Sequence, residues 1–139
     1  MGSHPANEPI LNFAPGSAER AELQAELKRQ MGEVVEIPCI IAGEEIFTGN
    51  TMTQVIPHNH GHIIANVHLA GPAEIADACN SAVAAQAAWL DLGLEARAAI
   101  FEHCADLLAG EWRARVNAAT MLNQSKNAFQ AEIDASCEL

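Results

Sequence analysis

Hydrophobic residues at helical spacing mark the first predicted element. Leu23 and Leu27 lie four residues apart, after an Ala-Pro-Gly-Ser turn sequence at residues 14–17. Ser17 is a residue type that favours the N-cap of a helix, and Gly32 is typical of a helix end. The pattern therefore predicts a helix that begins near Ser17 and ends near Gly32.

The next stretch, from about residue 35 to residue 70, changes to β-branched residues separated by glycine, proline and asparagine. This composition predicts a β-hairpin or a short meander. We expect its turns at residues 42–45, Ala-Gly-Glu-Glu, and at residues 58–61, His-Asn-His-Gly.

Helical spacing returns after Gly71 and continues to the end of the sequence. The pattern predicts a helix over residues 72–90, a second helix that follows Gly93 and ends at Gly110, and a third that begins near Glu111. With the first helix, these elements make the chain mainly α-helical.

The last segment is still periodic where the sequence stops. Phe129, Ile133 and Cys137 recur every four residues, and no capping residue, glycine, proline or basic residue follows them. We therefore expect the chain to be truncated at residue 139, inside a helix of a longer protein.

Composition and charge restrict the partners. The formal net charge is -11, which disfavours nucleic acid because no bulk attraction to phosphates is available. No apolar run is long enough to cross a bilayer, so we expect no membrane partner. The start of the sequence has neither an export signal nor an arginine-rich transit peptide, which favours a bacterial cytoplasmic location, or the mitochondrial matrix in a eukaryote.

Three alternating histidines are the first candidate site. In an extended strand, His58, His60 and His62 would point to one face and could hold a zinc or nickel ion. Asn59 and Gly61 instead favour a turn that scatters the three rings. We interpret the segment as a hydrogen-bonded turn and predict no metal site.

The spacing of the four cysteines indicates that they are structural residues. Cys79, Cys104 and Cys137 lie on apolar helical stripes and Cys39 lies among strand isoleucines, so we expect packed thiols rather than a nucleophile. No glycine-rich phosphate loop is present.

The final helix carries three carboxylates, Glu132, Asp134 and Glu138. Asp134 and Glu138 are four residues apart and so share a helix face. Spacing alone indicates a solvated acidic surface.

Several sequence blocks, in the same order, resemble the Δ1-pyrroline-5-carboxylate dehydrogenase family of the aldehyde dehydrogenase superfamily. The resemblance extends from Asn7 to Leu139, and the block at 130–135 is the most specific part of it. The blocks are NEPI at 7–10, FAPGS at 13–17, IPC at 37–39, PHNHGH at 57–62, QAEIDA at 130–135 and EL at 138–139.

The resemblance implies an α/β parent fold, aldehyde dehydrogenase-like, of which this chain is a mainly helical part. Residues 1–13 would form an extended N-terminal arm, whose first nine residues we expect to fray. Residues 14–139 would form the N-terminal part of the NAD-binding domain. The truncation expected at residue 139 fits a family whose members continue beyond this point.

The resemblance also implies the function. The family oxidises glutamate γ-semialdehyde to glutamate with NAD in proline catabolism, and its catalytic cysteine and general base lie downstream of residue 139. We therefore assign no catalytic, cofactor-binding or metal-binding residue to this chain, and we predict that the chain alone is inactive and binds no cofactor. Glu138 matches a carboxylate on a helix that lines the substrate pocket, which makes it the one pocket candidate.

The implied partners are the remainder of the enzyme or a companion chain, and a homo-oligomer of the full-length protein. An alternative of another class is a stand-alone, non-catalytic binding or assembly module that has kept this part of the fold.

Overall fold

The computed structural model describes residues 7–135 as five helices and five short strands. The elements confirm the mainly helical chain with a β segment near residues 35–70. In chain order they are α1 (Ala18–Met31), β1 (Val35–Ile37), β2 (Cys39–Ile41), β3 (Glu44–Ile46), β4 (Thr51–Ile56), β5 (Asn59–His68), α2 (Pro72–Asp91), α3 (Gly93–Ala109), α4 (Arg113–Gln124) and α5 (Ala128–Ala135).

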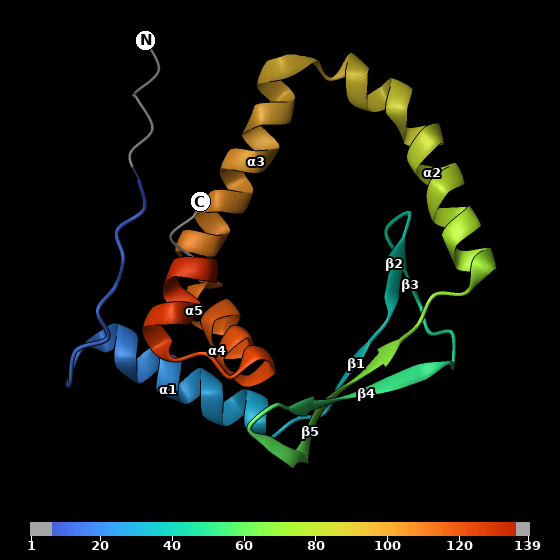
Figure 1. The fold of residues 1–139 in the computed structure, drawn as a ribbon. Coiled ribbons are helices and arrows are strands. Elements are labelled where there is room, and N and C mark those ends of the chain that lie inside the picture. Colours follow the sequence, from blue (N-terminus) through green and yellow to red (C-terminus); the bar gives the residue numbers. More distant parts are fainter. Residues whose placement is uncertain (1–6, 136–139) are drawn as a thin grey trace.

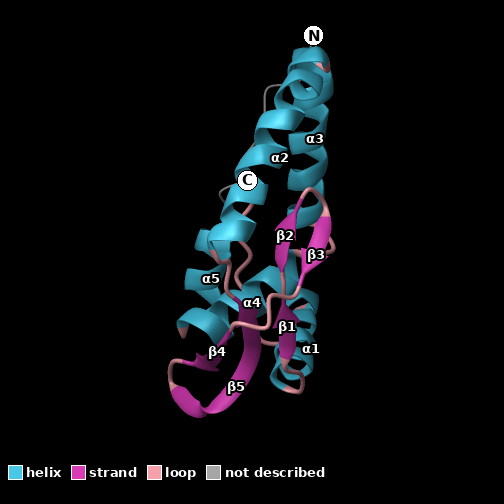
Figure 2. Ribbon diagram, turned by 90° about the vertical axis from the view of Figure 1, so that its right-hand side faces the viewer, coloured by secondary structure: helices cyan, strands magenta, loops and turns pink. Residues whose placement is uncertain are grey.

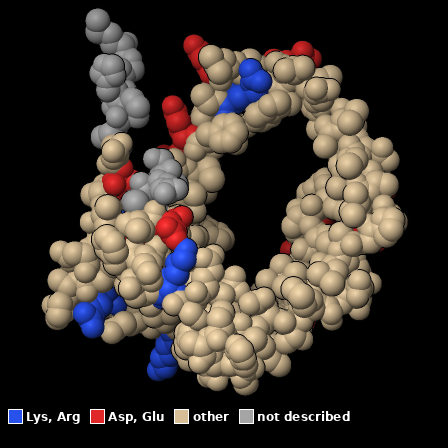
Figure 3. Space-filling model, viewed as in Figure 1, with Lys and Arg blue, Asp and Glu red and all other residues tan. Residues whose placement is uncertain are grey.

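These elements are arranged as a ring. Helices α1, α4 and α5 form a cluster on one side, the strands lie on the other side, and α2 and α3 arch between them (Figure 1). In the view turned by 90° the ring is narrow, with α2 and α3 one behind the other (Figure 2). The space-filling view shows that side chains leave the middle of the ring open (Figure 3).

Helix α1 has the predicted ends. The Ser17 hydroxyl accepts a hydrogen bond from the Arg20 amide, and Gly32 forms the C-cap. Basic Lys28 and Arg29 lie in the last turn, where they complement the helix dipole. The local sequence therefore encodes both ends of this helix.

The strands confirm the predicted hairpin, since β2-β3 and β4-β5 are both antiparallel hairpins, and they form two sheets. One sheet has the order β1-β5-β4, with β1 parallel and β4 antiparallel to β5, and the other is the antiparallel pair β2-β3. The parallel β1-β5 pair joins segments about 30 residues apart, so no local turn signal could predict it.

Both predicted turns are shorter than expected. The first consists of Ala42 and Gly43, both at positive φ, and Glu44 already belongs to β3. The second consists of Pro57 and His58, so His60 and His62 lie in β5 instead of in a turn. The glutamate and histidine residues were wrongly placed because polar side chains can also occupy exposed strand positions.

Helices α2 and α3 confirm the predicted positions, but their apolar stripes are not covered. No residue of either helix is buried, and the side chains of Ile75 and Val83 are 55% and 73% exposed. The expectation of packed thiols at Cys79 and Cys104 is therefore wrong for this chain. Gly93, with φ of 74°, separates the two helices in a conformation that an L-residue adopts only with strain.

The core lies in the helical cluster. Phe13 from the N-terminal arm, Leu23 from α1 and Ala118 from α4 are buried against one another. Leu27 and Ala128 pack at the edge of this core, so arm, α1, α4 and α5 form one packed unit. Within residues 7–135, no helix is long and apolar enough to cross a membrane.

Candidate functional site

The pocket candidate from the sequence, Glu138, lies outside the described residues, as does Cys137. The structure does describe α5, the helix that precedes both residues in the chain. The candidate site described by the structure consists of the groups that fix α5 in place.

A buried ion pair joins α5 to α4. Arg113, in the first turn of α4, pairs with Glu132 of α5, and the Glu132 side chain has no exposed surface. The Arg113 Nε donates to Glu132 Oε1 at 3.1 Å, and Asn117 Nδ2 donates to Glu132 Oε2 at 2.7 Å. We call Arg113, Asn117, Glu132 and Glu8 the clamp.

The N-terminal arm closes the clamp. The Leu11 amide donates to Glu132 Oε1 at 2.9 Å, and the Pro9 carbonyl accepts from Arg113 Nη2 at 2.6 Å. Glu8 forms a second ion pair with Arg113. The expectation that residues 1–9 fray is therefore wrong for Glu8 and Pro9. Arg113, more than 100 residues away, donates hydrogen bonds to the Glu8 carboxylate and to the Pro9 carbonyl.

The clamp keeps both partners charged. Burial raises the pKa of Glu132, but hydrogen bonds from Arg113, the Leu11 amide and Asn117 outweigh it, so the pKa lies below its ordinary value. Burial lowers the pKa of Arg113, and the contacts with Glu132 and Glu8 raise it overall. Because Glu132 is ionised and surrounded by donors, its chemistry is that of a structural anion.

The solvated acidic face predicted for α5 is correct for Asp134 and wrong for Glu132. Asp134 is exposed and pairs with Lys126. Glu132 lies on the stripe Ala128, Ala131, Glu132 and Ala135, which is buried or half-buried. A carboxylate on a stripe of alanines was the signal in the sequence for a buried, paired glutamate.

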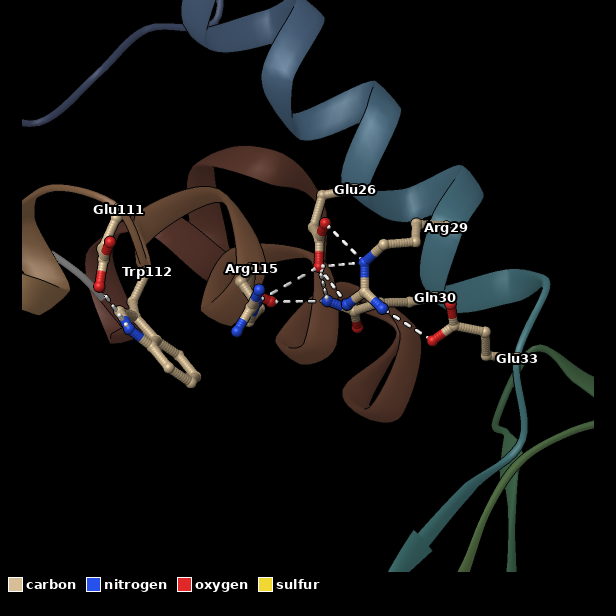
Figure 4. A network of polar contacts seen from close by, with 7 residues as sticks. All are labelled: Glu26, Arg29, Gln30, Glu33, Glu111, Trp112 and Arg115. Atoms are coloured by element: carbon tan, nitrogen blue, oxygen red, sulfur yellow. Dashed lines mark hydrogen bonds and ion pairs between the residues drawn. The ribbon is translucent and has the colours of Figure 1, made fainter.

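A second polar network joins α1 to α4 (Figure 4). Glu26 accepts from Arg29 Nε at 2.9 Å and from Gln30 Nε2 at 2.9 Å, and Gln30 also donates to the Arg115 carbonyl. The Arg115 guanidinium lies 4.4 Å from the centre of the Trp112 ring. Hydrogen bonding from Arg29 lowers the pKa of Glu26 from 4.5 to about 2.

This network borders a groove of about 550 Å³ between α1, α4 and the three-stranded sheet. Its walls are mostly aliphatic side chains, with arginine, tryptophan and amide side chains at the borders. The wall includes Val35, Ile37, Ala65 and Val67 from the strands and Val116 and Ala119 from α4.

Two of the candidate histidines, His58 and His62, and the cysteine Cys39 have ordinary structural contacts. His58 Nδ1 lies 2.7 Å from the Ser125 hydroxyl, and His62 Nε2 lies 2.9 Å from the Met31 carbonyl. The half-buried Cys39 thiol donates to the His68 carbonyl. Across residues 7–135, no three histidine, cysteine, aspartate or glutamate side chains gather as a metal-binding set.

The N-terminus of α2 is a candidate binding site for a phosphate group, because this helix follows β5 and begins after Gly71. The Gly71 amide already donates to Glu74 Oε2 at 2.7 Å, and a carboxylate there repels a phosphate. The N-terminus of α2 therefore does not fit a pyrophosphate group.

Comparison with known families identifies the fold. The model of the aldehyde dehydrogenase family matches residues 46–138, more than half of the chain. The chain belongs to the aldehyde dehydrogenase family.

Its similar relatives are Δ1-pyrroline-5-carboxylate dehydrogenases. The Agaricus bisporus enzyme is 44% identical over 135 residues, and the human mitochondrial enzyme is 43% identical over 134 residues. Each alignment covers 96% of this chain but only 25% and 24% of the relative, so the chain spans about a quarter of their length.

Solved structures give the same result. The Mycobacterium tuberculosis Δ1-pyrroline-5-carboxylate dehydrogenase bound with NAD superimposes with a TM-score of 0.95 at 41% identity, over 99% of this chain and 26% of that one. The Thermus thermophilus enzyme superimposes with a TM-score of 0.89 at 27% identity, over 98% of this chain and 26% of that one. These structures confirm the aldehyde dehydrogenase-like fold.

The clamp predicts a large effect of Glu132 on stability. Glu132→Gln leaves the Arg113 charge without its buried partner, and we expect the free energy of unfolding in urea to fall by about 3–5 kcal/mol. The matched variant Asp134→Asn, in the exposed pair with Lys126, should change it by less than about 1 kcal/mol. Equal effects of the two variants would contradict a stabilising role for the clamp.

The network around Glu26 predicts that the stability of the folded chain depends on pH. Since the pKa of Glu26 is about 2 in the folded chain against an ordinary 4.5, its stabilisation is complete above about pH 4.5 and is lost as the pH falls through about 2. Glu26→Gln should therefore lower stability by about 0.5–1 kcal/mol at pH 7 and have almost no effect below pH 2.

Thermal unfolding of both proteins from pH 2 to pH 7 measures this difference. Glu33→Gln is the control, because Glu33 is an exposed partner of the same Arg29. A constant difference between wild type and Glu26→Gln across this range would show that the Glu26 charge contributes nothing.

Proposed function

We propose that this chain is the N-terminal segment of an NAD-dependent Δ1-pyrroline-5-carboxylate dehydrogenase, the enzyme that oxidises glutamate γ-semialdehyde to glutamate in proline catabolism, and that it is inactive alone. The observation that carries the proposal is the identity of 41–44% with such enzymes over nearly the whole chain. The TM-score of 0.95 supports the shared fold.

The proposal assigns residues 14–139 to the N-terminal part of the NAD-binding domain and residues 1–13 to an extended N-terminal arm. The partner is the rest of the same enzyme, as one polypeptide or as a companion chain, and the complete enzyme is a homo-oligomer. We propose the mitochondrial matrix as its location in a eukaryote, since the names of the human and bovine relatives call them mitochondrial, or the cytoplasm in a bacterium.

In the complete enzyme, NAD would accept the hydride of the aldehyde while water supplies the second oxygen of the product acid. In this proposal the nucleophile and the general base of that reaction lie downstream of residue 139, since this chain has no nucleophile motif. Its part is to hold a helix: the clamp fixes α5 against α4, and Glu138 follows α5 by three residues.

We assign to Glu138 the role of a wall of the aldehyde pocket. A carboxylate there shapes the pocket and influences proton movement without attacking the substrate. The assignment rests on the resemblance of the sequence block that ends in Glu138 and Leu139.

A chimera tests the proposed function. This chain is joined to the downstream part of the Mycobacterium tuberculosis enzyme in place of its counterpart, and NADH formation is followed with glutamate γ-semialdehyde. We expect the chimera to be active and this chain alone to give no NADH, because the chain has no nucleophile motif.

Two other outcomes would contradict the proposed function. Activity of this chain alone contradicts the proposal. A folded but inactive chimera, together with a monodisperse chain that melts cooperatively and binds no hydrophobic dye, would support the stand-alone module instead. In our proposal the exposed stripes of α2 and α3 make this chain bind the dye.

The role of Glu138 is tested in the same chimera. Glu138→Ala should lower turnover by about 10²-fold if the carboxylate takes part in proton movement. Asp134→Ala is the control, because Asp134 is exposed, whereas Glu132 cannot serve as a surface control. Similar kinetics of the two variants, with unchanged circular dichroism, would remove Glu138 from the site.

A further inference from the structure

Helix α5 is short and is held at its N-terminal end and at its middle. At the N-terminal end, the Gln130 amide donates to Asn127 Oδ1 at 2.9 Å and the Asn127 amide donates to Gln130 Oε1 at 3.1 Å. At the middle, the clamp encloses the Glu132 carboxylate. A helix of eight residues is not stable by itself in water, so its direction depends on these contacts.

Arg113 connects α5 to the N-terminal arm, because its guanidinium pairs with two carboxylates. Its Nη1 donates to Glu8 of the arm, and its Nη2 donates to Glu132 of α5 and to the Pro9 carbonyl. Arg113 and Glu132 are buried, whereas the Glu8 side chain is 26% exposed. Glu8 is therefore the outer carboxylate of the clamp, and Arg113 is its link to Glu132.

The outer carboxylate determines how the buried pair is oriented. A guanidinium is a rigid planar fork, so contacts on two of its nitrogens fix the direction of the whole group. Neutralising Glu8 leaves Glu132 as the one carboxylate that holds Arg113 in the clamp. Water can take the place of the partly exposed Glu8 carboxylate, so this change should reorient the pair without leaving a buried charge unpaired.

We propose, on the basis of the proposed function, that Glu8 is a positioning residue for Glu138 and that it acts through Arg113 and Glu132 on the direction of α5. Helix α5 ends at Ala135, and Glu138 follows it by three residues. A change in the direction of α5 therefore moves the point from which the chain continues to Glu138. A displacement of about 1 Å at a reacting group can lower a rate by about 10²-fold, so a small movement of α5 is measurable as a loss of turnover.

Turnover of the chimera tests this role with a matched pair of variants. We expect Glu8→Gln to lower turnover on glutamate γ-semialdehyde by about fivefold to tenfold, with circular dichroism unchanged. Glu26→Gln is the control, because it also removes a carboxylate paired with an arginine but leaves the clamp intact. It should keep wild-type turnover. Equal losses in the two variants, or no loss in Glu8→Gln, would overturn the proposed role.

A double-mutant cycle then separates positioning of Glu138 from any other effect of Glu8. When Glu138→Ala has removed the positioned group, the further change Glu8→Gln should alter turnover by less than about twofold. A further loss of about fivefold or more in that background means that Glu8 acts elsewhere. That result overturns the proposed role and leaves the dehydrogenase function of the chimera intact.

Hydrogen exchange in this chain alone tests the link from the arm to α5 without the chimera. We expect the amides of α5 to exchange at least about tenfold faster in Glu8→Gln than in the wild type, and those of α1 to exchange equally in both. Equal exchange of α5 overturns the role of Glu8, whatever the activity of the chimera. Faster exchange of α5 together with an inactive chimera supports the link from Glu8 to α5 and contradicts the proposed function.

Discussion

The packed part of the molecule depends on the buried pair of Arg113 and Glu132. Bringing two charges out of water is unfavourable unless every donor and acceptor is satisfied, and here three segments share that task. The arm supplies the Leu11 amide and the Pro9 carbonyl, α4 supplies Arg113 and Asn117, and α5 supplies Glu132. Since no two of these segments complete the set, the pair couples the arm to the helices and fixes α5.

The arrangement divides the ring into two kinds of structure. The cluster of α1, α4 and α5 has its own core, whereas α2 and α3 have no buried residue and the sheet is covered on only part of one face. Both the packed cluster and the uncovered helices are expected if this chain is a segment of a larger enzyme, as we propose. The clamp and the core keep the segment in shape, and the open apolar surfaces of the arch and the groove are where the rest of the enzyme would pack.

Local signals predicted the helices well. The Ser17 cap and the Gly32, Gly93 and Gly110 breaks determine where helices begin and end, whatever covers them. Burial could not be predicted in the same way. The stripe of Ile75 and Val83 indicates that a face is apolar but not which part of the protein covers it, and Glu132 looked like a surface residue because its partner is 19 residues away in the sequence. For the same reason the parallel pairing of β1 with β5 was missed, and the pocket candidate Glu138 came only from family resemblance.

The clamp also sets an order of events during synthesis of the chain. Glu8 is separated from Arg113 by 105 positions and Leu11 from Glu132 by 121, so the arm leaves the ribosome long before the residues that hold it. At the usual rates of translation this delay lasts about 5–25 s. During that time α1 has no helix to pack against and the apolar arch is already outside the ribosome. Until α5 emerges the clamp cannot close, and the nascent chain exposes apolar surface that favours aggregation.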